Sequence, residues 1–306
     1  MSLAKRIFDC FKSREEFTLK EAYENNSDKP KETVRARIYD NLGVKFERIA
    51  KGVYRTIGGN GETCIVIEGD GRDLSILKDE SIDCIVTDHP WLDTKSNRGG
   101  DRNFAMYECF KYTKQDFMEK ARVLKEGCFL IEILPAENEN NYEYLYQIKQ
   151  YAKEAGFLYY SKVTWKKGDF VSNTGRKAKN SQDVMVFSKG KARSMRIDKK
   201  RTDNTGQLTY MSGCNGMLPA MFDIPPVAKR NRIHQSELPI SLCEQIIKYF
   251  TYEGEIVLDS FAGSGVVGEA ALNLKRNCVL IEILNENIRK IKERLGNNIF
   301  FEIVLE

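Results

Sequence analysis

Short apolar runs alternate with amphipathic segments along most of the chain, from residue 63 onward. Short apolar runs are typical of buried strands, and apolar residues at helical spacing are typical of amphipathic helices. This pattern predicts strands at residues 64–68, 82–87, 128–134, 158–165, 183–188, 256–259 and 278–282, and helices at residues 114–124, 142–155, 238–250, 267–274 and 285–295. Such alternation predicts an α/β fold with a doubly wound, mostly parallel seven-stranded sheet, in one domain over residues 62–306.

The first 57 residues follow a different pattern and predict a separate small module. A short helix is indicated by Ile7, Phe8 and Phe11, and Thr18 is placed to cap a second helix. Apolar residues at helical spacing predict a third helix over residues 31–42.

Two short β-like runs follow within residues 44–56, and the glycine-rich stretch 58–61 predicts a linker. Three short helices and a basic hairpin predict a winged helix-turn-helix over residues 1–57. Its third helix can lie in a major groove while the hairpin touches phosphate. The candidate DNA contacts are Arg35, Arg37 and Lys51. A protein-contact or dimerisation module of the same shape is the alternative.

Positive charge is concentrated in one part of the sheet domain. The formal net charge of +4 is too small to indicate a polyanionic partner by itself. Residues 162–201, however, hold thirteen Lys or Arg against three Asp, which predicts a phosphate-binding surface. Residues 189–232 are basic and weakly periodic, and they predict a target-recognition insert that reaches out to a large ligand. The candidate DNA contacts here are Lys166, Lys167, Arg176, Lys177, Lys199, Lys200 and Arg201. A solvated charged face is the alternative.

Composition excludes several classes of protein. The 306 residues are 42% hydrophobic and 30% charged, which favours one or two folded domains over disorder. Because no apolar run is long enough to span a bilayer and the first residues lack a signal-peptide core, we expect a cytoplasmic protein. The eight cysteines lack metal-ligand spacing and are accompanied only by His89 and His234. Reduced thiols and no metal site are therefore expected.

One predicted strand runs into a glycine-rich turn and then a helix, in the sequence VLDSFAGSGVVG at residues 257–268. Glycines there permit positive φ angles and close approach of a ligand, and free amides at the helix start attract polar groups. The next predicted strand ends at Glu282, where an acid is placed to accept hydrogen bonds from ribose hydroxyls. The motif predicts a nucleoside cofactor. Gly263, Gly265 and Gly268 also satisfy the dinucleotide spacing, so this turn alone does not exclude a nicotinamide cofactor.

A second motif, far earlier in the chain, discriminates between these cofactors. The sequence DCIVTDHPW at residues 83–91 is an apolar strand that ends in an acid, a proline and an aromatic residue. Side chains at the carboxyl end of a parallel strand face the ligand crevice. Asp88 and a main-chain carbonyl can accept hydrogen bonds from an exocyclic amine, and Trp91 can stack on a base taken out of its helix. The segment therefore predicts a site for a base amine.

These motifs and their order resemble the permuted β class of amino-methylating DNA methyltransferases, which modify adenine N6 or cytosine N4. In that family an Asp-Pro-Pro-Tyr-type motif precedes the target-recognition region, and a Phe-x-Gly-x-Gly cofactor motif lies near the carboxyl end. This chain has the same order. Further similar segments are 68–70, 122–127, 155–157, 165–167, 186–190 and 234–239, so the resemblance spans residues 62–295.

The resemblance implies S-adenosylmethionine as the cofactor, S-adenosylhomocysteine as the product and double-stranded DNA as the substrate. By position, Phe261, Gly263 and Gly265 would line the methionine end of the cofactor and Glu282 would hold its ribose. The remaining cofactor residues implied by the resemblance are Asp70, His234, Glu237 and Asp259.

By the same resemblance Asp88, His89, Pro90 and Trp91 would form the catalytic site for the target amine. The family usually has proline where this chain has His89. The main-chain carbonyl there can still accept a hydrogen bond, but the stiffness that proline gives to the backbone is lost. A histidine could instead act as a general base. Because the amine needs no prior loss of a proton to attack a sulfonium methyl, a shape-fitting role for His89 is favoured.

Several of these residues also have a purely structural interpretation. Asp70 and Asp259 could close turns at strand ends, Trp165 could lie in the core, and Glu237 could cap a helix that begins near residue 238. The catalytic motif is the hardest to explain by packing.

The sequence thus predicts a DNA methyltransferase that flips a base into the crevice and modifies adenine N6. The aspartate at the first motif position resembles the adenine-modifying members more than the cytosine-N4 members, which commonly carry serine. The alternatives are a cytosine-N4 DNA methyltransferase, a DNA-binding regulator that kept the fold but lost catalysis, and an RNA methyltransferase. A restriction endonuclease is a candidate partner, and the sequence does not indicate an oligomeric state.

Overall fold

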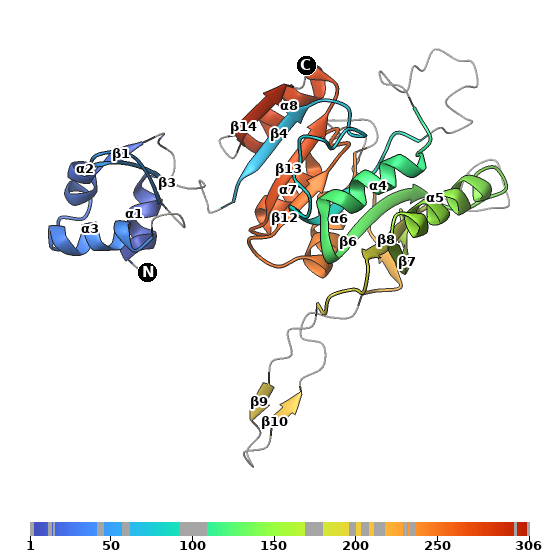
Figure 1. Ribbon diagram of the computed structural model, residues 1–306, viewed down its shortest axis with the longest axis horizontal. Helices are drawn as coiled ribbons and strands as arrows, with labels where there is room; N and C mark the ends of the chain where they lie inside the picture. Colours follow the sequence, from blue (N-terminus) through green and yellow to red (C-terminus); the bar gives the residue numbers. More distant parts are fainter. Residues whose placement is uncertain are drawn as a thin grey trace.

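The fold is known from a computed structural model. It describes residues 3–11, 14, 16–41, 46–56, 62–91, 109–168, 180–195, 200–202, 208–210, 218–228, 230, 232, 237–296 and 299–304. These residues form a small N-terminal unit and a large sheet with helices on both faces (Figure 1).

The N-terminal unit has a hydrophobic core of its own. Its elements are α1 (Leu3–Phe11), β1 (Phe17–Thr18), α2 (Leu19–Glu24), α3 (Lys31–Tyr39), β2 (Phe46–Ala50) and β3 (Val53–Thr56). The strands pair antiparallel in the order β1-β3-β2. In the core the rings of Phe11 and Phe17 stack with their centroids 4.3 Å apart. Three helices and a hairpin are thus present as predicted, with β1 as an additional strand.

The ends of two helices in this unit follow from local hydrogen bonds. Thr18 caps α2 as predicted, because its hydroxyl accepts from the Glu21 N–H (3.2 Å) while the Glu21 carboxylate accepts from the Thr18 N–H (2.8 Å). The third helix was predicted to reach residue 42, but it ends at Tyr39. The Asn41 amide donates to the Arg37 carbonyl at 2.8 Å, so a polar side chain satisfies the last turn instead of a further helical residue.

The large sheet holds nine strands in the order β11-β7-β8-β6-β5-β12-β13-β4-β14. They are β4 (Cys64–Glu68), β5 (Ile82–Thr87), β6 (Leu124–Pro135), β7 (Phe157–Lys166), β8 (Ser181–Lys189), β11 (Met221–Asp223), β12 (Ile256–Asp259), β13 (Asn277–Glu282) and β14 (Ile299–Val304). Only β8 among them runs antiparallel to its neighbours. The mostly parallel sheet is confirmed.

The predicted number of seven strands was wrong, because one strand is added at each edge. β14 is an apolar run after the last predicted helix, and it extends the sheet beyond β4. β11 has only three residues and lies inside the segment predicted to be an insert. A run this short carries no readable periodicity, and the pairing with β7 fixes it as a strand.

Helices cover both faces of this sheet (Figure 1). The helices are α4 (Lys114–Val123), α5 (Tyr142–Glu154), α6 (Ile240–Phe250), α7 (Val266–Asn273) and α8 (Asn285–Leu295), at the predicted positions to within a few residues. Apolar residues of α4 and α5 pack on one face and those of α6, α7 and α8 on the other. Along β5, Cys84 and Val86 face the second group while Ile85 faces the first, as strand alternation requires. The result is the doubly wound arrangement that the sequence predicts.

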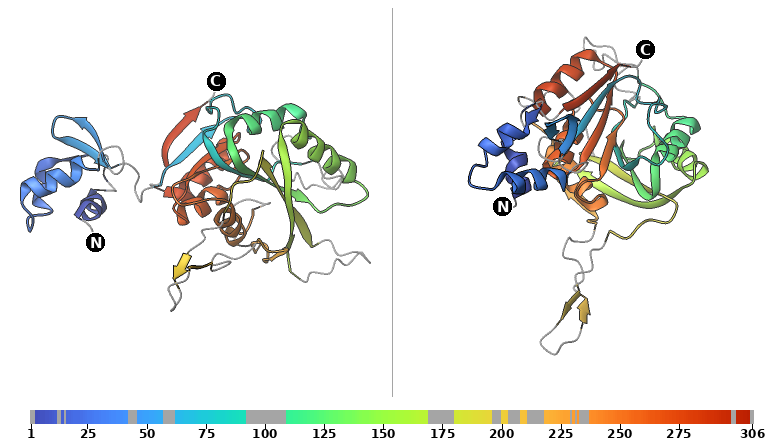
Figure 2. Two further views of the ribbon diagram at one scale, coloured as in Figure 1. Left: turned by 60° about the horizontal axis from the view of Figure 1, so that its bottom comes forward. Right: turned by 60° about the vertical axis from the view of Figure 1, so that its left-hand side comes forward.

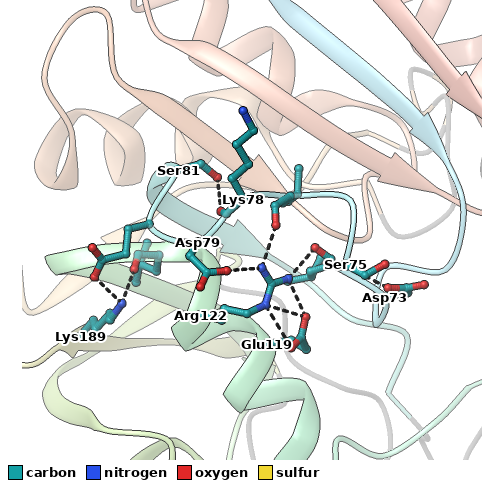
Figure 3. Close-up of polar contacts among 12 residues, drawn as sticks. Asp73, Ser75, Lys78, Asp79, Ser81, Glu119, Arg122 and Lys189 are labelled. Atoms are coloured by element: carbon teal, nitrogen blue, oxygen red, sulfur yellow. Dashed lines mark hydrogen bonds and ion pairs between the residues drawn. The ribbon is translucent and has the colours of Figure 1, made fainter.

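One arginine anchors the long connection between β4 and β5 (Figure 3). The Arg122 guanidinium in α4 donates to the Leu77 and Leu74 carbonyls (both 2.8 Å) and contacts Glu119 and Asp79 at 2.7 and 2.8 Å. Glu119 and Asp79 raise the Arg122 pKa. Arg122 thereby fixes the connection that follows β4 against the helix that precedes β6.

The predicted insert at residues 189–232 is only partly separate from the sheet. β9 (Lys200–Thr202) and β10 (Leu208–Tyr210) form a two-stranded antiparallel ribbon. All views show this ribbon apart from the nine-stranded sheet (Figure 2). The end of the same segment returns to the sheet as β11, where Phe222 and Ile224 are buried in the main core.

No helix among the described residues is long and apolar enough to cross a membrane. No group of three or more His, Cys, Asp and Glu in the described ranges is arranged to hold a metal ion. Seven of the cysteines are free thiols, of which Cys64, Cys84, Cys128, Cys243 and Cys278 are buried, and Cys214 lies outside the described residues.

Candidate functional site

The two motifs predicted to act together end on neighbouring strands. β5 and β12 pair in parallel, with Val257 opposite Cys84, so their carboxyl ends lie at the same edge of the sheet. The Thr87 hydroxyl at the end of β5 donates to the Asp259 carboxylate at the end of β12 over 2.9 Å. The acid-proline-aromatic segment and the glycine-rich turn therefore emerge side by side, although about 170 positions separate them in sequence.

Asp88 follows β5 immediately and has an unusual carboxyl group. It is partly exposed, and the Trp91 indole N–H donates to its Oδ1 over 3.3 Å. Loss of solvent around the carboxyl raises the pKa of Asp88 to about 7, against the opposing effect of the nearby Lys167 ammonium. At neutral pH the group is thus poised between an acceptor and a proton carrier.

Backbone hydrogen bonds fix the three residues after Asp88. The Trp91 N–H donates to the His89 carbonyl (2.8 Å), and the Phe110 N–H donates to the Pro90 carbonyl (3.2 Å). The His89 carbonyl keeps a second lone pair for another donor. The side chain of His89 is 1% exposed, and desolvation followed by Lys120 lowers its pKa well below the usual range. An imidazole with so low a pKa is a weak proton acceptor.

Glycine is favoured at two positions of the turn after β12 and at one position of the helix that follows. Gly263 and Gly265 have φ angles of +51° and +74°, in the left-handed region that side chains disfavour. Gly265 is the N-cap of α7. Within α7, a Cβ on Gly268 would lie 2.7 Å from the Leu280 side chain, so this glycine allows close packing of α7 on β13. The turn itself therefore has no side chain at Gly263 or Gly265.

Two carboxylates predicted from the sequence accept hydrogen bonds from backbone N–H groups of this turn. Glu282, at the end of β13, accepts from the Gly263 and Leu284 N–H groups, both at 2.8 Å. Asp259 accepts from the Phe261 N–H at 3.1 Å, and burial raises its pKa to about 7. The Asp259 carboxylate thus closes the turn after β12, and the Glu282 carboxylate lies beside Gly263.

An aromatic bridge connects the two motifs, and the sequence alone did not reveal it. Phe110 lies 5.4 Å from the Phe261 ring and 5.6 Å from the His89 ring, centroid to centroid. The Arg72 guanidinium lies 4.7 Å from the Phe110 ring, and its Nε donates to both Asp70 carboxylate oxygens, at 3.1 and 3.0 Å. Asp70 thus closes a turn with Arg72 at the edge of the site. No sequence signal marks Phe110, because it lies between a predicted strand and a predicted helix.

A buried polar cluster lies behind the catalytic segment and was also missed. Lys120 of α4 and Glu132 of β6 form an ion pair at 2.5 Å, and the Tyr112 hydroxyl donates to Glu132 at 3.1 Å. Burial lowers the pKa of Lys120 and raises that of Glu132. A lone glutamate in the apolar run 128–134 was the available signal, since a buried carboxylate in a central strand needs a partner.

The structure describes two of three further residues that the sequence pointed to. Glu237 forms an ion pair with Arg294 of α8 and does not cap α6, whose N-cap is Pro239. Trp165 is buried and its indole donates to the Ile224 carbonyl at 2.8 Å, which confirms the core interpretation. His234 lies outside the described residues.

Two of the predicted DNA contacts in the sheet domain lie at the carboxyl end of β7. Lys166 pairs with Asp223 at 3.2 Å, and the Lys167 ammonium lies 4.5 Å from the Trp165 ring centroid. Burial lowers the pKa of Lys167, while the Asp88 carboxylate favours its charged form. Arg176, Lys177 and Lys199 lie outside the described residues, and of Lys200 and Arg201 only the backbone, in β9, is described.

In the N-terminal unit the predicted DNA contacts are exposed. The Arg35 guanidinium in α3 lies 5.3 Å from the Tyr39 ring centroid, and Arg37 pairs with Asp40 at 2.8 Å. Lys51 lies in the turn between β2 and β3. One helix and one hairpin thus present three cations to solvent.

A family model and a known methyltransferase both match this chain. A family model for N6 and N4 methyltransferases, described as DNA methylase, matches residues 82–293. The type II methyltransferase M.HpaI of Haemophilus parainfluenzae is 28% identical over 229 residues, which cover 73% of this chain and 71% of M.HpaI.

Solved structures share the fold. The putative DNA modification methylase TTHA0409 from Thermus thermophilus, solved in complex with S-adenosyl-L-methionine, aligns with a TM-score of 0.54 and 18% identity over 80% of this chain and 100% of its own. The cytosine-N4-specific PvuII DNA methyltransferase aligns with a TM-score of 0.54 and 15% identity over 79% of this chain and 95% of its own.

Proposed function

This chain belongs to the N6/N4 family of S-adenosylmethionine-dependent DNA methyltransferases, and from that premise we propose that it methylates adenine N6 in double-stranded DNA. The observation that carries the proposal is the parallel pairing of β5 with β12. It brings the acceptor at Asp88 to the same edge of the sheet as the cofactor motif at Gly263.

The residues around the turn fit S-adenosylmethionine. Glu282 offers carboxylate oxygens to ribose hydroxyls, and Gly263 and Gly265 leave room for close backbone approach. Phe261 and Phe110 offer aromatic faces, which attract a cationic group. When bound, S-adenosylmethionine supplies a methyl group on a positively charged sulfur. By the family resemblance His234, Glu237, Asp70 and Asp259 belong to the same region.

The residues after β5 are suited to hold an exocyclic amine. The Asp88 carboxylate and the free lone pair of the His89 carbonyl accept its two hydrogens, which directs the nitrogen lone pair toward the methyl group. Trp91 stacks on the flipped base and, through its indole N–H, fixes the Asp88 carboxylate. Asp88 can also take the proton that the methylated amine gives up, since its pKa is raised to about 7.

Adenine is favoured over cytosine by the aspartate at the first motif position, which resembles the adenine-modifying members. The fold does not discriminate, since the cytosine-N4-specific PvuII enzyme shares it. The order of the motifs likewise supports membership of the permuted β class. M.HpaI is by its name a type II methyltransferase. We therefore extend the proposal to methylation of a defined DNA sequence, with a restriction endonuclease as the partner protein.

We further propose that the chain divides into a winged-helix module at residues 1–57 and a methyltransferase domain at residues 62–306, and that both contact DNA. The order of helices and strands in the first unit and its antiparallel sheet support the winged-helix assignment. Arg35 and Arg37 on α3 and Lys51 in the hairpin are placed to meet a groove and phosphate. Lys166 and Lys167, with the β9–β10 ribbon, would form the second contact.

The target is identified by incubating the full chain with unmethylated duplex DNA and S-adenosylmethionine that carries a deuterated methyl group, followed by mass spectrometry of the nucleosides. We expect labelled N6-methyldeoxyadenosine, and no label with Asp88→Ala. Labelled N4-methyldeoxycytidine would show that the target is cytosine and not adenine. Binding of DNA without any label would indicate the regulator, and label found only on added structured RNA would indicate an RNA substrate.

A further inference from the structure

Tyr144 of α5 contacts the side chain of His89. The Nε2 of His89 lies 2.9 Å from the hydroxyl oxygen of Tyr144, and its ring lies 3.9 Å from the Tyr112 ring, centroid to centroid. Tyr144 itself is partly buried and projects from the first turn of α5. In the proposed reaction the base would meet the His89 backbone and not its ring, so this contact would act on methyl transfer only through the backbone.

The position of the proton on His89 depends on the direction of its hydrogen bond with Tyr144. The Tyr112 N–H donates to the Tyr144 hydroxyl oxygen over 2.9 Å, and the hydroxyl hydrogen can be donated to His89 Nε2. With Nε2 as the acceptor, the imidazole proton lies on Nδ1. The Nδ1 atom has no hydrogen-bond partner among the described residues but lies 4.0 Å from Glu132 Oε2, so an N–H there points its positive end toward a carboxylate.

The cluster also reaches the backbone that would meet the amine. Tyr112 belongs to the same short segment as Phe110, whose N–H holds the Pro90 carbonyl. The His89 carbonyl is in turn held by the Trp91 N–H. Side-chain and main-chain contacts from residues 109–113 therefore clamp the residues after Asp88 on both sides.

We propose that Tyr144 is a positioning residue: its hydroxyl holds the His89 ring and so gives the backbone at His89 the stiffness that proline supplies in related enzymes. The inference rests on the proposed function for its kinetic consequence but not for the hydrogen bond itself. Proline restricts its own φ and the residue before it. Here an anchored and stacked ring restrains the same segment.

The hydrogen bond is tested on the wild-type chain by ¹⁵N NMR of its two histidines, with His234→Gln to assign the His89 signals. We expect the His89 signals of a neutral ring protonated at Nδ1 with a hydrogen-bonded, unprotonated Nε2. Tyr144→Phe should remove the hydrogen-bond shift of Nε2. Protonation at Nε2 in the wild type would overturn the assignment, whatever reaction the protein catalyses.

The positioning role is tested by steady-state methyl transfer to unmethylated duplex DNA. Loss of one hydrogen bond predicts that Tyr144→Phe lowers kcat by about fivefold. The KM for S-adenosylmethionine should stay within about twofold, because the hydroxyl does not touch the cofactor. Tyr146→Phe is the matched control, since Tyr146 lies on the same helix and is exposed.

His89→Phe keeps a stacked ring but removes the hydrogen-bond acceptor at Nε2. It tests the same hydrogen bond from the other side, in case Tyr144→Phe disturbs folding. If the two groups act as a pair, the double variant His89→Phe with Tyr144→Phe should be no slower than the slower single variant. Independent, multiplying losses would overturn the proposal. So would a Tyr144→Phe enzyme that matches Tyr146→Phe in kcat, or one that loses only thermal stability.

Discussion

At the scale of single residues, the account depends most on the carboxyl group of Asp88. Its environment withholds water and raises its pKa to about 7, a condition that favours the protonated form at acid pH. Such a group is costly to keep ionised in the folded protein. That cost is a usual property of groups placed for chemistry instead of stability.

Replacing this carboxyl by an amide should therefore separate activity from stability. Asp88→Asn is expected to lower kcat at least about 100-fold, because a neutral amide accepts less strongly than a carboxylate and cannot take the proton that the methylated amine gives up. Folding raises the Asp88 pKa, so the folded state holds more protons than the unfolded state between about pH 4 and 7, and stability falls as pH rises through that window. The variant should consequently have a higher Tm than the wild type at pH 8 and lose this advantage near pH 4.

Thermal unfolding at the two pH values measures this difference. An Asp88→Asn variant that is less stable than the wild type at pH 8 would contradict the assigned environment.

The rate should also depend on the ionisation of this carboxyl. We expect kcat to rise with pH and to level off above an apparent pKa of about 7, because ionised Asp88 is the better acceptor and can take the proton released by the amine. Burial also raises the pKa of Asp259 to about 7, so the residual activity of Asp88→Asn decides between them. A pH rise that persists in that variant would assign it to Asp259 and not to Asp88.

The sequence located the candidate ligand-binding residues better than those that support them. Asp88, Trp91 and Glu282 stand at the ends of apolar strands, where a polar or aromatic residue has an obvious direction. Tyr112 and Tyr144 carry no such mark, since a tyrosine on a helix or in a loop is equally consistent with packing. Only the contacts of His89 with α5 and with the segment before α4 show that they meet His89.

At the scale of elements, the turn between β12 and α7 leaves no room for a side chain at Gly265. This residue combines a φ of +74° with a close neighbour, since a Cβ there would lie 3.0 Å from the Ile291 side chain of α8. Both the backbone and the packing thus oppose a side chain at this position. By the proposed function the same turn also lines the cofactor site.

Gly265→Ala should accordingly lower the free energy of unfolding by about 1–3 kcal/mol and weaken binding of S-adenosylmethionine. Gly156→Ala is the matched control, because Gly156 has a φ of +93° but nothing within 4 Å of the added Cβ. Calorimetric titration and chemical denaturation measure both effects. Equal losses in the two variants would show that backbone strain alone matters and that α8 yields to the extra atom.

Most elements, but not the edges of the sheet, followed from periodicity. The predicted strands in the middle of the sheet are largely buried on both faces, so their apolar runs are continuous and easy to recognise. β11 is three residues long and alternates exposed and buried, so no pattern of this length could identify it. β14 had an apolar run, yet its place beside β4 depends on a pairing that local sequence does not encode.

At the scale of the whole molecule, two separate groups of cations are available for one duplex. One lies on α3 and the hairpin of the N-terminal unit, and the other lies at the end of β7 beside Asp88. A net charge of +4 conceals this distribution. If both groups touch phosphate, each contributes to the dependence of DNA binding on salt.

The combined substitution Arg35→Ala and Lys51→Ala should weaken DNA binding and leave the affinity for S-adenosylmethionine unchanged. The slope of log K against log salt should fall by about one for each phosphate that no longer meets a cation. Lys275→Ala removes an exposed charge at the amino end of β13, at the opposite edge of the sheet from Asp88, and should have little effect. An unchanged salt slope in the double variant would favour a protein-contact module over a winged helix that binds DNA.

The central claim is that the segment after Asp88 and the turn at Gly263 serve one cofactor and one amine at the shared edge of β5 and β12. A crystal structure of the full chain with S-adenosylhomocysteine measures this most directly. We expect the ribose hydroxyls at Glu282 and the sulfur on the side that faces Asp88. A nucleoside bound away from Glu282, or a sulfur turned away from Asp88, would contradict the proposed site.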